Sequence, residues 1–172
     1  MSTQPKPTPA GSDGRADSFL HVQTKRAGKI KGEGATQGHT DDIEVRTWHW
    51  GVAAGTAIGS GAVTARRQYK HLVITKGIDT ASTALLSALA SNDVVVEAKL
   101  MLRKAGGEAL DYYRMTLGDA RVVGIDLDVD AFGFPTETVT FAYAKIDVEY
   151  KRQEHSGMSG GSSAFTDEVF NP

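Results

Sequence analysis

The residues best suited to chemistry lie in DLDVDAFGFPTE, residues 126–137, where carboxylates occupy the positions that bind calcium in a twelve-residue loop. These carboxylates belong to Asp126, Asp128, Asp130 and Glu137. The sixth position holds Ala131, although such a loop needs glycine there for its sharp turn. Hydrophobic residues also alternate with the aspartates, as in a strand with one face in water. The pattern therefore favours a strand, and we expect no specific calcium binding.

Histidine and aspartate also gather in GHTDD, residues 38–42. His39 could ligate a metal with Asp41 and Asp42 if His49 came near as a further ligand. Zinc requires closely fixed ligands, whereas three such residues in a polar loop are common by chance. We therefore predict no metal site.

Motifs of catalysis and cofactor binding are missing from the sequence. The glycine-rich stretches at 32–38 and 55–61 lack the spacing of phosphate-binding loops and do not join a strand to a helix. No serine stands in a nucleophile elbow, and no carboxylate pair stands out as a general acid and base. The basic run at 25–31 lacks interleaved aromatic residues and favours a solvated loop. We predict no catalytic residue and no cofactor.

The composition indicates one globular domain. The chain has 172 residues, of which 40% are hydrophobic, and its net charge is -2. This charge argues against a nucleic-acid binder that works through an overall positive field. The lack of cysteine excludes a disulfide scaffold, and no apolar run is long enough to span a bilayer. The N-terminus has no apolar segment of the kind that directs secretion.

Hydrophobic patterns predict a mainly antiparallel β domain with one helix. Strands are expected at 18–23, 43–52, 68–75, 94–104, 108–117, 120–129 and 136–150. The turn at 105–107 joins two of them as a hairpin, and Val96, Ala98, Leu100 and Leu102 share one face of the strand before it. Between 79 and 91, hydrophobic residues recur at helical spacing behind the capping candidates Asp79 and Thr80.

The domain is predicted to span residues 17–153. Residues 1–16 are rich in Pro, Gly, Ser and Thr, and we interpret them as a disordered extension. Residues 154–172 begin as a linker and are interpreted as a flexible tail. The apolar residues near its end could dock on a neighbouring chain.

Two tryptophans flank a histidine in RTWHWGV, residues 46–52. In an extended strand Trp48 and Trp50 share one face, and His49 takes the other. The two indoles are predicted to anchor the strand in the core, because they bury a large apolar area. His49 then points away from that core.

The apolar phase changes within two of the predicted strands. Ile43 and Val45 lie on the face opposite Trp48 and Trp50, and a similar slip occurs near Ala144 in the last strand. Either a bulge resets the register, or the two ends bury opposite faces against different elements. We infer that neighbouring subunits cover the outer faces, which predicts an oligomer.

Several stretches resemble, in order, the haemolysin-coregulated protein (Hcp) family, the tube proteins of type VI secretion. The resemblance starts with IKGEG at 30–34, His39 and the Trp strand, and covers most of residues 17–150. The most specific stretches are the RKAGGE hairpin and the closing strand, TETVTFAYAKIDVEY. The extension at 1–16 departs from the family, and the tail after Tyr150 matches it only weakly.

The resemblance implies a compact β-barrel with a flanking helix that assembles into hexameric rings. Stacked rings would form a hollow tube that carries effectors, fills a contractile sheath and is expelled beneath a VgrG-type spike, without a signal peptide and without enzymatic activity. The tube would assemble in the bacterial cytoplasm and then reach the extracellular space or the target cell. His49 is a candidate lumen residue, although a position facing a neighbouring subunit or the outer surface is equally compatible. The family's stacking loop corresponds to Gly55, Thr56, Ala57, Ile58, Gly59, Ser60 and Gly61.

Two other functions fit the sequence. A tail-tube protein of a phage or another contractile particle would share the fold and the assembly. A monomeric β-barrel that binds a small ligand would share only the fold. Solution mass separates the second possibility from a ring-forming protein.

Overall fold

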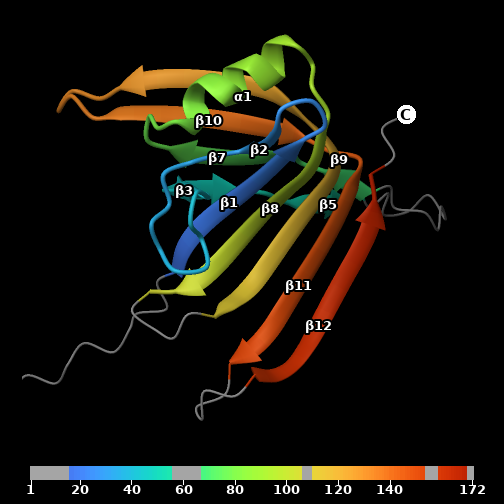
Figure 1. Ribbon diagram of the computed structural model, residues 1–172. Helices are drawn as coiled ribbons and strands as arrows, with labels where there is room; N and C mark the ends of the chain where they lie inside the picture. Colours follow the sequence, from blue (N-terminus) through green and yellow to red (C-terminus); the bar gives the residue numbers. More distant parts are fainter. Residues whose placement is uncertain (1–15, 56–66, 106–109, 154–158, 170–172) are drawn as a thin grey trace, which may run out of the picture.

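The computed structural model describes residues 16–55, 67–105, 110–153 and 159–169 (Figure 1). The predicted extension therefore lies almost wholly outside the described residues, as does the predicted stacking loop apart from Gly55. Within these ranges the chain forms antiparallel strands and one helix, as predicted. The elements are β1 (Ala16–Thr24), β2 (Gly28–Ile30), β3 (Ile43–Val45), β4 (Thr47–His49), β5 (Val52–Ala54), β6 (Arg67–Tyr69), β7 (Leu72–Lys76), α1 (Ala81–Ala90), β8 (Val95–Lys104), β9 (Asp111–Val129), β10 (Pro135–Ala142), β11 (Lys145–Gln153) and β12 (Ser159–Glu168).

The strands close into a barrel. β1, β8, β9, β10, β7 and β4 follow one another as hydrogen-bonded neighbours. The two ends of this row are joined by the segment that contains β3 and β4, which are consecutive in the chain. β4 pairs with β7 at one end of the row, and β3 pairs with β1 at the other. β11 extends the sheet sideways from β9, and β12 pairs with β11. The prediction of a two-sheet or barrel-like β domain is confirmed.

β9 joins the two halves of the barrel. Its first half pairs with β8 and β11, and its second half pairs with β10. The sequence predicts two strands here, at 108–117 and 120–129. They form one strand because Gly118 and Ala120 both keep their partners on β8, although Asp119 between them adopts a left-handed backbone conformation, with φ of 47°.

The phase changes in the sequence mark places where the chain passes from one pair of strands to another. The closing strand is interrupted at Tyr143 and Ala144, so β10 lies beside β7 and β9, and β11 lies beside β9 and β12. The Trp strand changes partner at Arg46, from β1 to β7. Of the two explanations left open, burial against different elements is therefore the correct one. Both elements belong to the same chain, so the phase changes carry no evidence of a neighbouring subunit.

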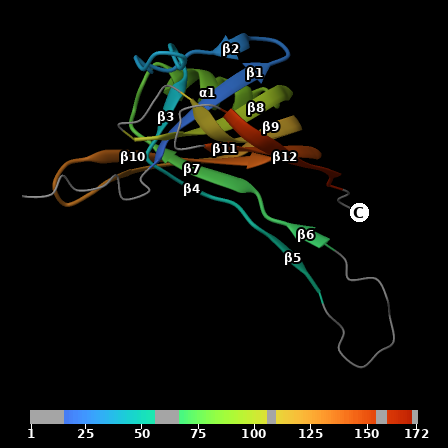
Figure 2. The same cartoon turned by 90° about the horizontal axis from the view of Figure 1, so that it is seen from below.

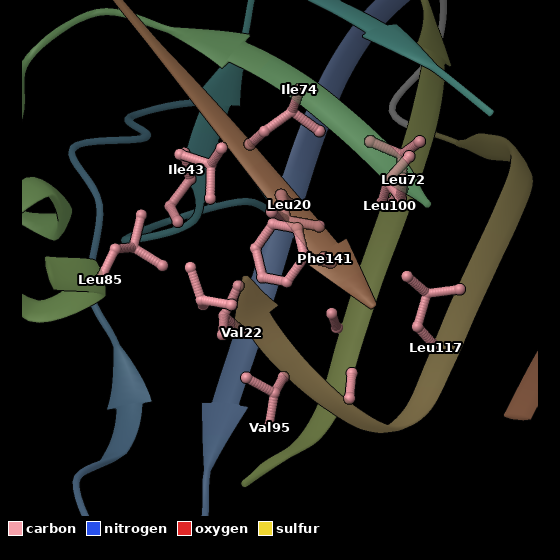
Figure 3. Close-up of a cluster of buried hydrophobic side chains, with 14 of the residues drawn as sticks. Leu20, Val22, Ile43, Leu72, Ile74, Leu85, Val95, Leu100, Leu117 and Phe141 are labelled. Atoms are coloured by element: carbon pink, nitrogen blue, oxygen red, sulfur yellow. The ribbon is translucent and has the colours of Figure 1, made fainter. Parts of the chain in front are cut away.

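The core fills the barrel and the space beneath α1 (Figure 3). Leu20, Ile74, Leu100 and Phe141 are completely buried, and each contributes about 1.5–3 kcal/mol by leaving water. The helix adds Leu85 to this core. Among the described residues, no helix has the length and apolarity to cross a membrane.

Of the two predicted capping residues, Asp79 is the one that acts. Its carboxylate accepts a hydrogen bond from the backbone of Ala81 at 3.0 Å, and this satisfies one of the free N–H groups at the start of α1. Thr80 makes no side-chain capping bond and instead donates to the carbonyl of Lys31.

Two local predictions need correction. Val96 was expected to share the inner face with Ala98, but its side chain is 45% exposed. Val95 is buried instead, because Val96 is an extra residue in the pairing of β8 with β1. The tail predicted at 154–172 contains a regular strand, β12, paired along its length with β11. Its exposed glycines and serines conceal this strand in the sequence, because it has almost no apolar face.

Candidate functional site at the base of the β5–β6 ribbon

β5 and β6 form a ribbon that leaves the barrel. They pair antiparallel, with Ala54 opposite Arg67, and make a sheet separate from that of the other strands (Figure 2). The side chains of Val52, Ala53 and Ala54 are all exposed. The predicted stacking loop lies between these two strands in the sequence, and both strands project away from the barrel.

Trp50 lies at the base of this ribbon. Its indole nitrogen donates to the Tyr143 hydroxyl at 2.5 Å, and that hydroxyl donates to the carbonyl of Lys70 at 2.8 Å. The Trp50 ring also packs against Tyr69 of β6, with 6.3 Å between ring centroids. Trp50 is half-buried at the edge of the core. It therefore connects the barrel to the ribbon, whereas the sequence predicts an anchor wholly within the core.

Asp167 of β12 also contacts the ribbon. It accepts a hydrogen bond from the Tyr69 hydroxyl, and its carboxylate lies 3.0 Å from the guanidinium of Arg67. Burial, and then the bond to Asp167, raise the pKa of Tyr69 to about 12, so the phenol is a proton donor at neutral pH. The same hydrogen bond lowers the pKa of Asp167. The stability this carboxylate contributes is therefore present above its unfolded-state pKa and is lost as the pH falls through the lower folded value.

Trp48 and His49 point in opposite directions from β4. Trp48 stands opposite the buried Ile74, lies against the core and stacks near Tyr113, with 6.4 Å between ring centroids. It is half-buried, whereas His49 is exposed. The face that His49 would present in a ring stays a prediction.

We expect Trp48→Ala to lower the free energy of unfolding by about 2–4 kcal/mol, below the full cost of emptying a buried aromatic site, because the indole is half-buried. His49→Ala should change it by less than about 0.5 kcal/mol, as is usual for a surface position. Denaturant unfolding of both variants measures the two values. A larger loss for His49→Ala would show that the two faces are assigned the wrong way round.

His39, the candidate metal ligand, lies between two carboxylates. The His39 ring is fully buried, with Nε2 2.7 Å from Asp111 and Nδ1 3.0 Å from Asp42. It also stacks on Phe19 with 4.1 Å between ring centroids. Asp41 and His49 do not join this cluster. Among the residues that the structure describes, no three histidine, aspartate or glutamate side chains are grouped to hold a metal ion.

The glycines at the start of the neighbouring stretch have a structural role. A Cβ atom on Gly32 or Gly34 would collide with the backbone of the 39–43 segment. Both amides donate to that segment, to the carbonyls of Asp41 and Asp42. This stretch is therefore glycine-rich because two backbone segments pack closely there.

The carboxylates that resemble a calcium loop do not converge. Asp126 and Asp128 are exposed, while Glu137 stands opposite Leu127 and points from the other face into the barrel. There its carboxylate lies 2.7 Å from the ammonium of Lys76 and accepts from Ser82 at 2.6 Å. The strand predicted for this stretch continues through the residues around Asp126.

Lys76 is the centre of a polar cluster that the sequence reading missed. Its side chain is completely buried, and its ammonium also lies 2.8 Å from Asp79. The cluster ties β7, β10 and the start of α1 together. A signal was available, because Leu72, Ile74 and Lys76 alternate on the inner face of one strand. No comparable pattern points to Tyr69 and Asp167, which lie 98 residues apart.

An antiparallel barrel with a flanking helix defines the class of this protein, and known proteins match it in sequence and fold. The family model described as "Type VI secretion system effector, Hcp" matches residues 19–150. Protein hcp1 of Pseudomonas aeruginosa is 31% identical over 149 residues, which cover 84% of this chain and 89% of that protein. The Major exported protein of the same organism is 34% identical over 133 residues, covering 72% and 76% of the two chains.

A solved structure agrees with these matches. One described as "Structure of a type six secretion system protein" superposes with a TM-score of 0.80 at 24% identity and covers 90% of this chain and 96% of its own. At this identity the likeness bears on the fold, whereas the family follows from the sequence matches. The chain belongs to the Hcp family of type VI secretion proteins.

Proposed function

We propose that this protein is the structural tube subunit of a bacterial type VI secretion system. Six copies form a ring, and rings stack into a hollow tube that carries effectors in its lumen. A contractile sheath expels the tube beneath a VgrG-type spike, so the protein assembles in the cytoplasm and leaves the cell as part of the tube. The subunit has no catalytic role, cofactor or metal, and does not bind nucleic acid or insert into membranes.

The observation that carries the proposal is membership of the Hcp family, over residues 19–150. The projecting ribbon supports ring stacking in particular. Most of its side chains are exposed, so the ribbon buries little surface within the subunit. Contact with another molecule would explain why it projects from the barrel. A long connection within a compact domain is usually functional or disordered. The loop between β5 and β6 is therefore our candidate for the contact with the next ring.

A monomeric ligand-binding barrel is less well supported. The barrel interior is occupied by side chains such as Leu20, Leu100 and Phe141. Of the described residues, a group including Glu33, Glu44 and Asp79 lines an open hollow of about 250 Å³. Sites for small molecules are usually apolar and hold about 300–1,000 Å³.

We expect the purified protein to be a hexamer by native mass spectrometry and to form tubes at high concentration by electron microscopy. Replacing residues 55–66 by Asn-Gly should keep the hexamer and abolish the tubes. Ala54 and Arg67 are directly paired, so a two-residue turn can close the shortened hairpin. A stable monomer at micromolar concentration would overturn the tube proposal, and normal tubes from the shortened chain would exclude this loop as the stacking element.

A further inference from the structure

The C-terminal strand and the ribbon meet at one residue. Asp167 is held in the ladder between β12 and β11, opposite Ile146, and Val169 just beyond it bonds to the carbonyl of Ala144 at 2.7 Å. Its backbone is therefore part of the barrel sheet. Its side chain reaches Tyr69 and Arg67, which belong to the ribbon. A residue of the final strand thus connects the barrel to the ribbon.

The described part of the ribbon has few other supports. Its strands pair only with each other, and Val52, Ala53, Arg67 and Gln68 are exposed. On the barrel side its base is supported by Trp50 and by the Tyr143 hydroxyl. A two-stranded ribbon of three residues a side is marginally stable by itself. Its direction therefore depends on the few contacts at its base.

Of the two groups that reach Asp167, Tyr69 is the more important. A phenol that donates to a carboxylate makes a charge-assisted hydrogen bond, which is about twice as strong as a neutral one. The Tyr69 side chain is half-buried, whereas the side chain of Arg67 is 59% exposed. Ion pairs so open to solvent contribute little. The hydroxyl of Tyr69 and the carboxylate of Asp167 are therefore the pair to test.

We propose that Asp167 is a positioning residue that fixes the direction in which the β5–β6 ribbon leaves the barrel, so that the C-terminal strand controls ring stacking. The stacking part rests on the proposed function. The positioning part concerns a single subunit and can be tested whether or not rings stack. In this view the C-terminal strand acts on the stacking contact through the ribbon, without itself touching the next ring.

Three variants test the proposal. Tyr69→Phe removes one hydroxyl, and Asp167→Asn removes one negative charge. Glu168→Gln is the matched control, because it removes a charge from the next residue of the same strand, whose side chain is exposed. Hexamers of all three should form as in the wild type, because the ribbon lies outside the barrel.

Ribbon direction is measured first. The chain contains no cysteine, so spin labels can be placed at Gln68→Cys on β6 and Ser87→Cys on α1, both exposed. Labelled subunits are diluted into unlabelled protein, and the distance distribution within one subunit is recorded by pulsed electron resonance. We expect one narrow distribution for the unmodified chain and for Glu168→Gln. Tyr69→Phe and Asp167→Asn should broaden or shift it, and unchanged distributions would overturn the positioning role.

Stacking is measured on the same variants. We expect Tyr69→Phe and Asp167→Asn to reduce the number of stacked rings roughly tenfold at equal protein concentration, the effect of losing one hydrogen bond to a charged group. Tubes equal to those of Glu168→Gln would overturn the link to stacking while leaving the tube function intact. If the unmodified chain forms no tubes, the proposed function fails, and the spin-label distances still decide whether Asp167 positions the ribbon.

Discussion

Lys76→Met is expected to lower the free energy of unfolding by about 3–5 kcal/mol, the usual cost of removing one partner from a buried ion pair. Methionine has nearly the length of lysine, so the packing changes little. The carboxylates of Glu137 and Asp79 would lose the ammonium that now lies 2.7 and 2.8 Å away. Glu137 is itself almost fully buried, so water cannot replace the lost partner. Denaturant unfolding followed by tryptophan fluorescence measures the loss.

A matched control and a double variant make this prediction specific. Lys99→Met removes a lysine from a surface pair with Glu97, at 2.9 Å, and should cost less than about 1 kcal/mol. The combination of Lys76→Met with Glu137→Gln should destabilise less than the sum of the single variants, because both remove the same interaction. Additive losses would show that Lys76 and Glu137 are not coupled.

His39→Ala is expected to cost about 2–5 kcal/mol, because two nearly buried carboxylates each lose a hydrogen-bonding partner. The variant also loses the stacking on Phe19. His71→Ala is the control, since this histidine is exposed and should change stability by less than about 0.5 kcal/mol. Equal stability of the two variants would contradict a structural role for His39.

The loss of stability in His39→Ala is expected to be greatest in one segment of the chain. His39 joins the segment between β2 and β3 to Asp111, at the start of β9. We therefore expect hydrogen exchange to rise first at the amides of Gly32 and Gly34, which bond to that segment. Uniform acceleration throughout the barrel would mean that the cluster stabilises the whole fold and not this segment in particular.

The main features of the fold could be read from the sequence. The helix was predicted within 79–91 from residues that recur at helical spacing, and the structure has it at 81–90. The strands were predicted from alternation and β-branched residues. These are local patterns, and they are informative because a helix or strand face repeats every few residues. The family could be recognised for a similar reason, because long ordered stretches such as the closing strand match it. The first part of the calcium-like loop was correctly interpreted as a strand, since alternation continues through Asp126 and Asp128, whereas Asp130 begins the turn to β10.

Local sequence patterns do not determine which strands pair with each other. The slips near Arg46 and Ala144 predicted that something changes there, but the pattern carries no information on which element covers the second face. Only the folded chain assigns β3 to β1 and β4 to β7, and so closes the barrel. β12 was missed because its glycines and serines leave it almost no apolar face. The strand is identified in the structure by its hydrogen-bonded pairing with β11.

The sequence by itself thus determined the class of fold, the positions of most elements and the family. The tertiary structure alone decided which polar groups meet. Lys76 and Glu137 lie 61 residues apart, and Tyr69 and Asp167 lie 98 apart. A hydrogen bond depends on distances of about 3 Å between atoms, and such proximity is set by the path of the backbone between them. No periodicity in the sequence around these residues encodes that path. The contact between the ribbon and the last strand is therefore known only from the tertiary structure.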